Sequence, residues 1–479
     1  MAIDQQAQSR IVVIGGGLAG LAAAEALASL PAVRVTVIES AGRHGGVLGT
    51  VRRDGWLVER SADCFLAARP EGIDLVARLG LAGELLGVDP RVRRALVWHA
   101  GRALPVPRGF RLLAPGRVDG VLATPLLSPW GRLRVVGERF VPVRSAAPGD
   151  DESLEQFAVR RLGREAFERL VQPLAAGIWT ADPARLSMTA ACPEFLAMER
   201  EQGSLWAGER HRLAGHAHAA EGTGARYGQF VTFAGGMETL PARLVEHLRG
   251  RGVDFMPAVA RRLRQVPGRG WEIDLAVPAT APLPAAAVVV AVPARGAAAL
   301  LGEVDAPLAA DLAGIEYAGS VIVSLGFARE DVAHPLDAAG LVVPRRAGRR
   351  ILAVSFSSSK FPDRAPAGCV LMRVFIGGAL DPRAVHLGDD ALVEVARREV
   401  GDLLGARGRP RLVQVDRWES SMPQYHLGHA ARVARIDAAV ARHPGLALAG
   451  AAYTGVGIPQ VIASGQAAAR VASTTVPAG

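Results

Sequence analysis

IVVIGGGLAG, residues 11–20, is the stretch that decides the fold. Its four leading apolar residues predict a buried strand, and the small residues after the glycines predict a helix from about 18 to 30. Gly15 permits the tight turn, Gly17 lets the backbone approach a pyrophosphate, and Gly20 lets helix and strand pack closely. The N-terminus of the helix offers free N–H groups to a phosphate. The residues expected at a dinucleotide are Gly15, Gly16, Gly17, Leu18, Ala19 and Gly20.

The next segment distinguishes between dinucleotides. A second predicted strand ends at Glu39, where an acid can accept hydrogen bonds from the ribose hydroxyls of an adenine nucleotide. The chain continues as ESAGRHGG, the ExxxRxGG pattern of many flavin oxidoreductases, with Ser40 directly after the acid. Arg43 can pair with phosphate, while Gly45 and Gly46 let the backbone run under an isoalloxazine ring. This extension predicts FAD rather than NAD.

The far end of the chain carries a matching half-site. Residues 446–459, LALAGAAYTGVGIP, predict a strand and a glycine turn, and a helix is expected from about 459 to 472. The N-terminus of that helix points back at the turn, where its partial positive charge would stabilise a reduced flavin. The residues expected to contact the cofactor here are Gly450, Gly455, Val456, Gly457 and Ile458.

Together with three further segments, these motifs resemble the protoporphyrinogen oxidases of the flavin amine-oxidase superfamily. The segments are PLAAGIWTADP at 173–183, FAGGM at 233–237, and a match to LxGxxYxGxGIPxxIxSGxxAA at 448–468. The resemblance implies one non-covalently bound FAD per chain and no metal. It also implies a six-electron oxidation of protoporphyrinogen IX to protoporphyrin IX in haem biosynthesis. O2 would be the electron acceptor and H2O2 the second product, and the flavin itself would carry the chemistry.

One loop departs from the family. Where the family has Gly-Pro-Asn-Ser-Phe, this chain has Ser61, Ala62, Asp63 and Cys64 before a phenylalanine. The loop approaches the flavin in the family, so all four residues are expected at the cofactor. Asp63 stands in place of an amide and would bring charge close to flavin or substrate. It is the one side chain beyond the flavin with a candidate catalytic role.

The resemblance implies further contacts. Val259 matches the position where the backbone meets the adenine end, and Trp418 matches an aromatic residue beside the flavin. Because a porphyrinogen is an apolar disc with carboxylate arms, it needs a wide apolar pocket with a cation at the rim. Arg93 and Arg94 lie where the family holds an arginine that binds a propionate, although Ala95 is an alternative occupant of that position.

The expected fold class is α/β, with a discontinuous Rossmann-like FAD-binding domain, an inserted α+β substrate domain and a mostly helical membrane-docking region. The FAD-binding domain is predicted at 1–90, 230–300 and 410–479, the helical region at 91–229, and the substrate-binding domain at 301–409. Apolar segments mixed with arginine in 105–145 suggest peripheral contact with a membrane. The alternatives for these segments are core packing or a homodimer surface.

Composition narrows the function classes. No apolar run reaches the roughly 18 residues of a spanning helix, and the N-terminus does not resemble a secretory signal. Three widely spaced cysteines predict neither disulfides nor a metal site, so a cytoplasmic protein is expected, with peripheral contact at the inner face of the membrane. The net charge of +9 comes without the basic–aromatic runs of nucleic-acid binders.

Three rival functions stay open. Coproporphyrinogen III oxidation shares fold and cofactor but takes a substrate with four carboxylates rather than two. An amine oxidase or a desaturase of the same superfamily is a second rival, although only four tyrosines are available for an aromatic cage. A flavoprotein without catalytic activity is the third.

Overall fold

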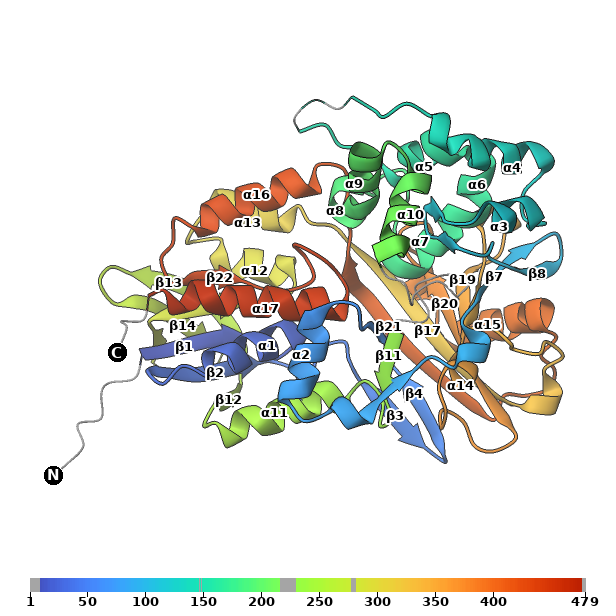
Figure 1. Cartoon of the computed structure of the whole chain (residues 1–479). Helices are drawn as coiled ribbons and strands as arrows, with labels where there is room; N and C mark the ends of the chain where they lie inside the picture. Colours follow the sequence, from blue (N-terminus) through green and yellow to red (C-terminus); the bar gives the residue numbers. More distant parts are fainter. Residues whose placement is uncertain (1–8, 146, 148, 216–229, 277–280, 476–479) are drawn as a thin grey trace.

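The computed structural model describes residues 9–145, 147, 149–215, 230–276 and 281–475. Two sheets organise these residues, and the first is parallel, with strand order β12-β2-β1-β16-β22 (Figure 1). Its strands are β1 (Ser9–Ile14), β2 (Val33–Glu39), β12 (Asp254–Pro257), β16 (Ala287–Val290) and β22 (Leu446–Leu448). The central strand β1 is apolar throughout its buried half because helices or strands cover both faces of this sheet.

One face of the parallel sheet packs against four helices, and the other against three helices and a small sheet. The first face carries α1 (Leu18–Leu27), α2 (Pro70–Arg78), α11 (Thr239–Gly250) and α17 (Ile458–Ser473). The second carries α12 (Ala294–Leu301), α13 (Ala306–Ala313) and α16 (His429–Val440), with β13 (Ala260–Val266), β14 (Gly270–Leu275) and β15 (Leu283–Ala285). Helices α1 and α17 lie side by side (Figure 1) because Gly465 permits close contact: a Cβ there would lie 2.2 Å from the Ala19 carbonyl oxygen.

The second sheet has seven strands in the order β21-β17-β20-β19-β18-β7-β8. They are β7 (Ala95–His99), β8 (Arg102–Pro105), β17 (Tyr317–Ala328), β18 (Gly340–Val342), β19 (Ile351–Phe356), β20 (Cys369–Gly377) and β21 (Leu412–Pro423). One face packs against α15 (Asp389–Leu404), and part of the opposite face packs against a helical layer. Side chains alternate between the two faces, as in any strand.

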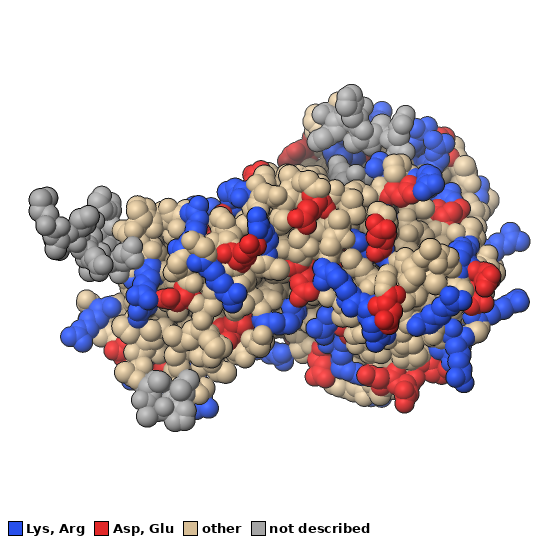
Figure 2. Space-filling model, turned by 90° about the horizontal axis from the view of Figure 1, so that it is seen from below, with Lys and Arg blue, Asp and Glu red and all other residues tan. Residues whose placement is uncertain are grey.

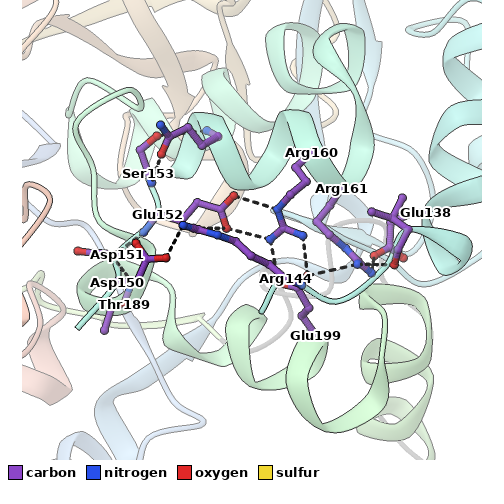
Figure 3. A network of polar contacts seen from close by, with 12 residues as sticks. Glu138, Arg144, Asp150, Asp151, Glu152, Ser153, Arg160, Arg161, Thr189 and Glu199 are labelled. Carbon is purple, nitrogen blue, oxygen red and sulfur yellow. Dashed lines mark hydrogen bonds and ion pairs between the residues drawn. The ribbon is translucent and has the colours of Figure 1, made fainter. Parts of the chain in front are cut away.

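The helical layer lies above this sheet in Figure 1. Its helices are α3 (Val118–Ala123), α4 (Pro129–Val136), α5 (Leu154–Leu162), α6 (Arg164–Ala166), α7 (Gln172–Trp179), α8 (Met188–Ala191), α9 (Pro193–Gln202) and α10 (Leu205–Gly215). A buried ionic network joins α5 and α9 to Glu138, which follows α4, and the fully buried Arg161 lies at its centre (Figure 3).

Short elements complete the described chain. The remaining strands and the one remaining helix are β3 (Thr50–Arg53), β4 (Trp56–Glu59), β5 (Phe65–Leu66), β6 (Leu85–Gly87), β9 (Phe110–Arg111), β10 (Ala114–Pro115), β11 (Phe230–Phe233) and α14 (Ser357–Lys360). The 3-10 helices are η1 (Ala82–Glu84), η2 (Pro90–Val92), η3 (Gly137–Phe140), η6 (Arg329–Asp331), η7 (Arg345–Ala347) and η8 (Ala384–His386). The π-helical turn is η4 (Phe167–Val171).

The α/β class and the leading βαβ unit are confirmed, while one predicted helix is not continuous. The sequence of residues 151–172, with Ser153 near its start, predicts a single helix, but these residues form α5, α6 and the π-helical turn η4 and run into α7. Gly163 ends α5 because its φ of +90° is outside the helical region. Ser153 caps α5 through a capping box with Gln156, as its sequence position suggested.

At two places, strands from different predicted domain ranges pair in the same sheet. Strand β21 falls in 410–479 but pairs with β17 in the seven-stranded sheet, and β7 and β8 join the same sheet from within 91–229. Strand β21 pairs antiparallel with β17 and β7 pairs parallel with β18, and local sequence encodes neither of these contacts between distant segments. Residues 216–229 of the expected helical region lie outside the described residues, and the division into domains stays a prediction.

In the part of the chain that the structure describes, none of the helices combines the length and apolar character needed to cross a bilayer. On the face drawn in Figure 2, positive and negative side chains are interspersed rather than gathered in one basic field.

Candidate functional site

The first glycine turn has the geometry that its sequence predicts. The Gly15 N–H donates to the Ile38 carbonyl oxygen at 2.8 Å, and the φ of Gly15 is +110°. A Cβ at Gly20 would lie 1.9 Å from the Gly15 carbonyl oxygen, so helix and turn could not pack with any side chain there. Gly17 differs, because a Cβ there would meet only the Gly46 Cα at 3.9 Å. The protein thus leaves the space beside Gly17 open.

Glu39 closes the turn from the end of β2. Its carboxylate accepts hydrogen bonds from the N–H groups of Gly16 and Ala41, both at 2.7 Å. Val259 lies close by, because the adjacent Ala258 donates its N–H to the Glu39 carbonyl oxygen at 3.1 Å. The Val259 side chain is half exposed. The structure therefore brings Val259 beside the acid expected at the ribose, while Ser40 next to Glu39 is exposed.

Arg43 stabilises the turn at Gly45 and Gly46 that follows it. Its guanidinium donates to the carbonyl oxygens of Leu48 at 2.9 Å, His44 at 3.3 Å and Gly46. The Gly45 N–H donates to the Gly16 carbonyl oxygen at 2.8 Å, which joins this turn to the first one. In this structure Arg43 thus holds the Gly45–Gly46 backbone in place, and a phosphate contact for it stays a prediction.

The C-terminal turn depends on a residue that sequence reasoning missed. The Tyr425 hydroxyl accepts from the Gly455 N–H at 2.8 Å and donates to the Ala451 carbonyl oxygen at 2.6 Å. The Gly450 N–H donates to the Ser464 hydroxyl at 3.0 Å, and α17 begins after Gly457 without a side-chain cap. Burial raises the pKa of Tyr425, so the hydroxyl stays protonated. The one sequence signal for Tyr425 is that tyrosine is rare, with four in the chain.

Ion pairs of Asp63 hold the 61–64 loop in place. Asp63 forms ion pairs with Lys360 and, at 3.2 Å, with Arg373, and it accepts from the Cys64 thiol at 3.2 Å. Burial alone would raise the pKa of Asp63, but Lys360 and Arg373 lower it well below its ordinary value. Burial raises the pKa of Cys64, with the Asp63 charge adding to the effect. The sequence analysis anticipated neither cation.

Ser61 and Trp418 lie at the same loop. The Ser61 hydroxyl donates to the Val47 carbonyl oxygen at 2.6 Å, just after the ExxxRxGG segment. The Trp418 indole N–H donates to the Arg60 carbonyl oxygen at 2.9 Å, and Arg60 pairs with Asp416 at 2.7 Å. The loop is therefore fixed between the second glycine turn and β21.

The predicted substrate arginines are already engaged. Arg94 donates to the Asp337 carbonyl oxygen at 2.9 Å and forms an ion pair with the Asp337 carboxylate. Arg93 donates to the Val88 carbonyl oxygen at 3.2 Å, and Ala95 is buried in β7. Both partners of the Arg94 pair are partly exposed, so a substrate carboxylate could compete for the guanidinium at low cost.

The site fits a dinucleotide. Helices α1 and α17 both begin at glycines without side-chain caps, so their first N–H groups are available to an anion. The buried Nδ1 of His44, beside the first turn, has no hydrogen-bond partner among the described residues. No group of three or more His, Cys, Asp or Glu within those residues is arranged to hold a metal ion. Fold and site together define an FAD-dependent oxidoreductase.

Comparison with known proteins agrees with this class. The chain belongs to the family described as flavin containing amine oxidoreductase, which matches residues 18–473. It is 31% identical over 474 residues to coproporphyrinogen III oxidase of Bacillus subtilis, covering 98% of each chain. It is 29% identical to the chloroplastic protoporphyrinogen oxidase of Nicotiana tabacum, covering 94% of this chain and 83% of that one. A solved structure from Exiguobacterium sp. 255-15, provisionally described as a protoporphyrinogen oxidase, has a TM-score of 0.83 at 29% identity, covering 98% of this chain and 99% of that one.

The resemblance to porphyrinogen oxidases is thereby confirmed, and the cofactor is FAD.

Tyr425→Phe is expected to weaken FAD binding about tenfold while the fold persists. The change leaves the Gly455 N–H without its acceptor, and losing one partner of a buried hydrogen bond costs about 1–3 kcal/mol. The measurement is the dissociation constant of FAD by flavin fluorescence. Tyr317→Phe is a matched control, because the Tyr317 hydroxyl accepts from the Ala294 N–H in the core behind the parallel sheet. Equal losses in both variants would contradict a specific role for Tyr425.

Proposed function

We propose that this chain oxidises coproporphyrinogen III to coproporphyrin III with bound FAD, with O2 as electron acceptor and H2O2 as second product. The observation that carries the proposal is the end-to-end similarity to the Bacillus subtilis enzyme, and the uncapped starts of α1 and α17 after glycines support it. FAD supplies the hydride-accepting chemistry when bound. The protein contributes the two glycine turns that hold the cofactor and the helix N-termini that stabilise added negative charge.

Protoporphyrinogen IX is the second candidate substrate. It is the substrate that the sequence motifs first suggested, and the similarity to the Exiguobacterium structure supports it. The two substrates differ in the number of carboxylates, so cations at the rim of the site would distinguish them. Arg93 and Arg94 are our proposed carboxylate contacts. The tetracarboxylate should depend on them more strongly than the dicarboxylate.

The decisive experiment supplies each porphyrinogen, freshly reduced and in air, to the FAD-loaded protein. Porphyrin fluorescence and oxygen uptake are followed together, with a protein-free blank for spontaneous oxidation. We expect kcat/KM for coproporphyrinogen III to exceed that for protoporphyrinogen IX at least tenfold, a difference of about 1.4 kcal/mol in transition-state stabilisation. The reverse preference would favour the second candidate. No turnover of either by FAD-loaded protein would reject both.

We also propose that the helical layer contacts a lipid surface. Several large apolar side chains of residues 118–143 are exposed, with Trp130 at 79% and Phe140 at 77% accessibility. The other exposed apolar residues in the same segment are Val118, Leu122, Leu133 and Val143. The Arg139 guanidinium lies 4.9 Å from the centre of the Phe140 ring, and this mixture of cations and apolar side chains suits an interface with anionic lipid.

Vesicle binding tests this contact. The double variant Trp130→Ser/Phe140→Ser is expected to bind vesicles of phosphatidylcholine with phosphatidylglycerol at least 100-fold more weakly, because each buried aromatic side chain contributes about 1.5–3 kcal/mol. Val471→Ser is the matched control, since Val471 is exposed on α17 away from this segment. If the wild type does not bind vesicles, and light scattering finds a dimer that the double variant loses, the segment is a homodimer surface instead.

A further inference from the structure

Lys360 is the one lysine among the 55 Lys and Arg residues of the chain. Everywhere else the sequence supplies its side-chain cation as arginine. Lysine differs from arginine in having a compact ammonium group rather than a planar fork. A single lysine in a buried ion pair is therefore an exception to the composition of the rest of the chain.

Lys360 belongs to a buried charge cluster. Its ammonium pairs with Asp63, whose carboxylate also lies 3.2 Å from Arg373. The exposed fractions of the side chains are 8% for Lys360, 13% for Asp63 and 1% for Arg373. Ser355 stands opposite Arg373 on the neighbouring strand and donates its hydroxyl to Asp63 at 3.4 Å. One negative and two positive groups are thus shielded from solvent together.

The cluster lies between the two glycine turns. The Arg60 N–H donates to the Gly49 carbonyl oxygen at 2.9 Å, which ties the loop to the end of the ExxxRxGG turn. Phe65, two residues after Asp63, packs at the start of α17: a Cβ on Gly72 would lie 3.2 Å from the Phe65 ring and 3.4 Å from Pro459. The Gly45–Gly46 turn and the start of α17 are the segments expected at the isoalloxazine ring, so we place this loop at the flavin end of the cofactor.

The charges do not cancel. Asp63 stays ionised at neutral pH because Lys360 and Arg373 lower its pKa, despite the opposing effect of burial. Among the surrounding charged groups, Arg60 pairs with Asp416 at 2.7 Å, and the Glu59 carboxylate is attracted to both Arg373 and Arg364. The cations of Arg60 and Arg364 balance the carboxylates of Asp416 and Glu59, so these neighbours add no net charge to the cluster. The cluster keeps one net positive charge inside a poorly solvated region, where its field is weakly screened.

We propose that Asp63, Lys360 and Arg373 set the reduction potential of the bound FAD by holding one net positive charge beside it. Reduction adds negative charge to the flavin, so a nearby positive charge favours the reduced form. Asp63 keeps the two cations from raising the potential further, and Lys360 prevents the carboxylate from lowering it. The charge acts on the bound cofactor, and its effect on the potential is the same whichever porphyrinogen is the substrate.

The test measures the two-electron reduction potential of FAD in holoprotein without substrate. Asp63→Asn restores the amide of the family and removes the negative charge, so the potential should rise. Lys360→Met removes a positive charge, so the potential should fall. Each shift is expected to be about tenfold in the equilibrium constant, or about 30 mV. The double variant has the wild-type net charge and should return near the wild-type potential.

The controls separate charge from packing. Lys360→Arg keeps the charge and Ser355→Ala changes none, so both should leave the potential within a threefold change in the equilibrium constant. Single variants that move the potential in the same direction, or a double variant that adds rather than cancels their effects, would overturn the proposal. If Asp63→Asn fails to fold, the comparison of Lys360→Met with Lys360→Arg decides alone: equal potentials in these two variants reject the proposal. Because no porphyrinogen is present, the result is independent of the substrate assignment.

Discussion

Gly17→Ala is expected to weaken FAD binding at least 100-fold while leaving the fold intact. Gly17 is the residue before α1, with φ of −71°, so an alanine is not strained there. The protein also has room for the added methyl group, whose nearest described neighbour would be the Gly46 Cα at 3.9 Å. That room is the space a pyrophosphate needs at the helix N-terminus. A 100-fold loss corresponds to about 2.7 kcal/mol.

Two comparisons sharpen this experiment. Gly42→Ala should bind FAD normally, because nothing lies within 4 Å of a Cβ at that position in the same segment. Gly15→Ala should lose the fold as well as the cofactor, since its φ is +110° and its Cβ would lie 2.5 Å from the Ala291 carbonyl oxygen. FAD affinity is measured by fluorescence titration, and folding by thermal unfolding of the cofactor-free protein. Normal FAD affinity in Gly17→Ala would disprove the pyrophosphate site.

The sequence predicted those parts of the site that depend on local geometry. A triple-glycine turn between a strand and a helix has few possible conformations, so Gly15, Gly17 and Gly20 could be assigned to separate roles. Each role agrees with what a Cβ would meet in the structure. The C-terminal turn was predicted for the same reason, because glycines before a Pro-initiated helix fix the direction of that helix.

Contacts between distant segments could not be predicted. Tyr425 lies 30 residues before Gly455 and in a different sheet region, and no periodic pattern links the two. Lys360 is 297 residues from Asp63, and only the packing of the seven-stranded sheet brings them together. The charge at Asp63 was expected, but its neutralising partners were not. Long-range pairs of this kind depend on tertiary packing, which single-sequence reasoning does not specify.

Arg161→Met is expected to lower the free energy of unfolding by about 3–5 kcal/mol, the cost of leaving a buried charge without its partner. Arg161 and Glu138 are both fully buried and form an ion pair, and Arg161 also lies 3.3 Å from Glu199 (Figure 3). Arg164→Met is the matched control, because Arg164 pairs with Glu155 at the surface and such pairs contribute about 0–1 kcal/mol. Both variants are compared in the FAD-bound state by urea unfolding.

A rescue variant tests the cause. Removing both charges, as in Arg161→Met/Glu138→Gln, should recover much of the lost stability, because no buried charge is then left unpaired and the amide oxygen still accepts from the Leu205 and Trp206 N–H groups. A double variant as unstable as Arg161→Met alone would show that packing, rather than charge, is lost. The result matters for function because Glu138 lies in η3, the turn that also carries the exposed Phe140 of the segment that we propose contacts lipid.

The pH dependence of stability gives an independent check on the same network. Burial would raise the pKa of Glu199, but Arg160 and Arg161 lower it below its ordinary value. A depressed pKa contributes stability that is complete above the unfolded value of about 4.3 and is lost as the pH falls through the folded value. Without Arg161 the folded pKa moves back up, so Arg161→Met should unfold at a higher pH in acid titration than the wild type. Arg164→Met should unfold at the wild-type pH, and an unchanged acid midpoint in Arg161→Met would contradict the assigned role of the buried arginine.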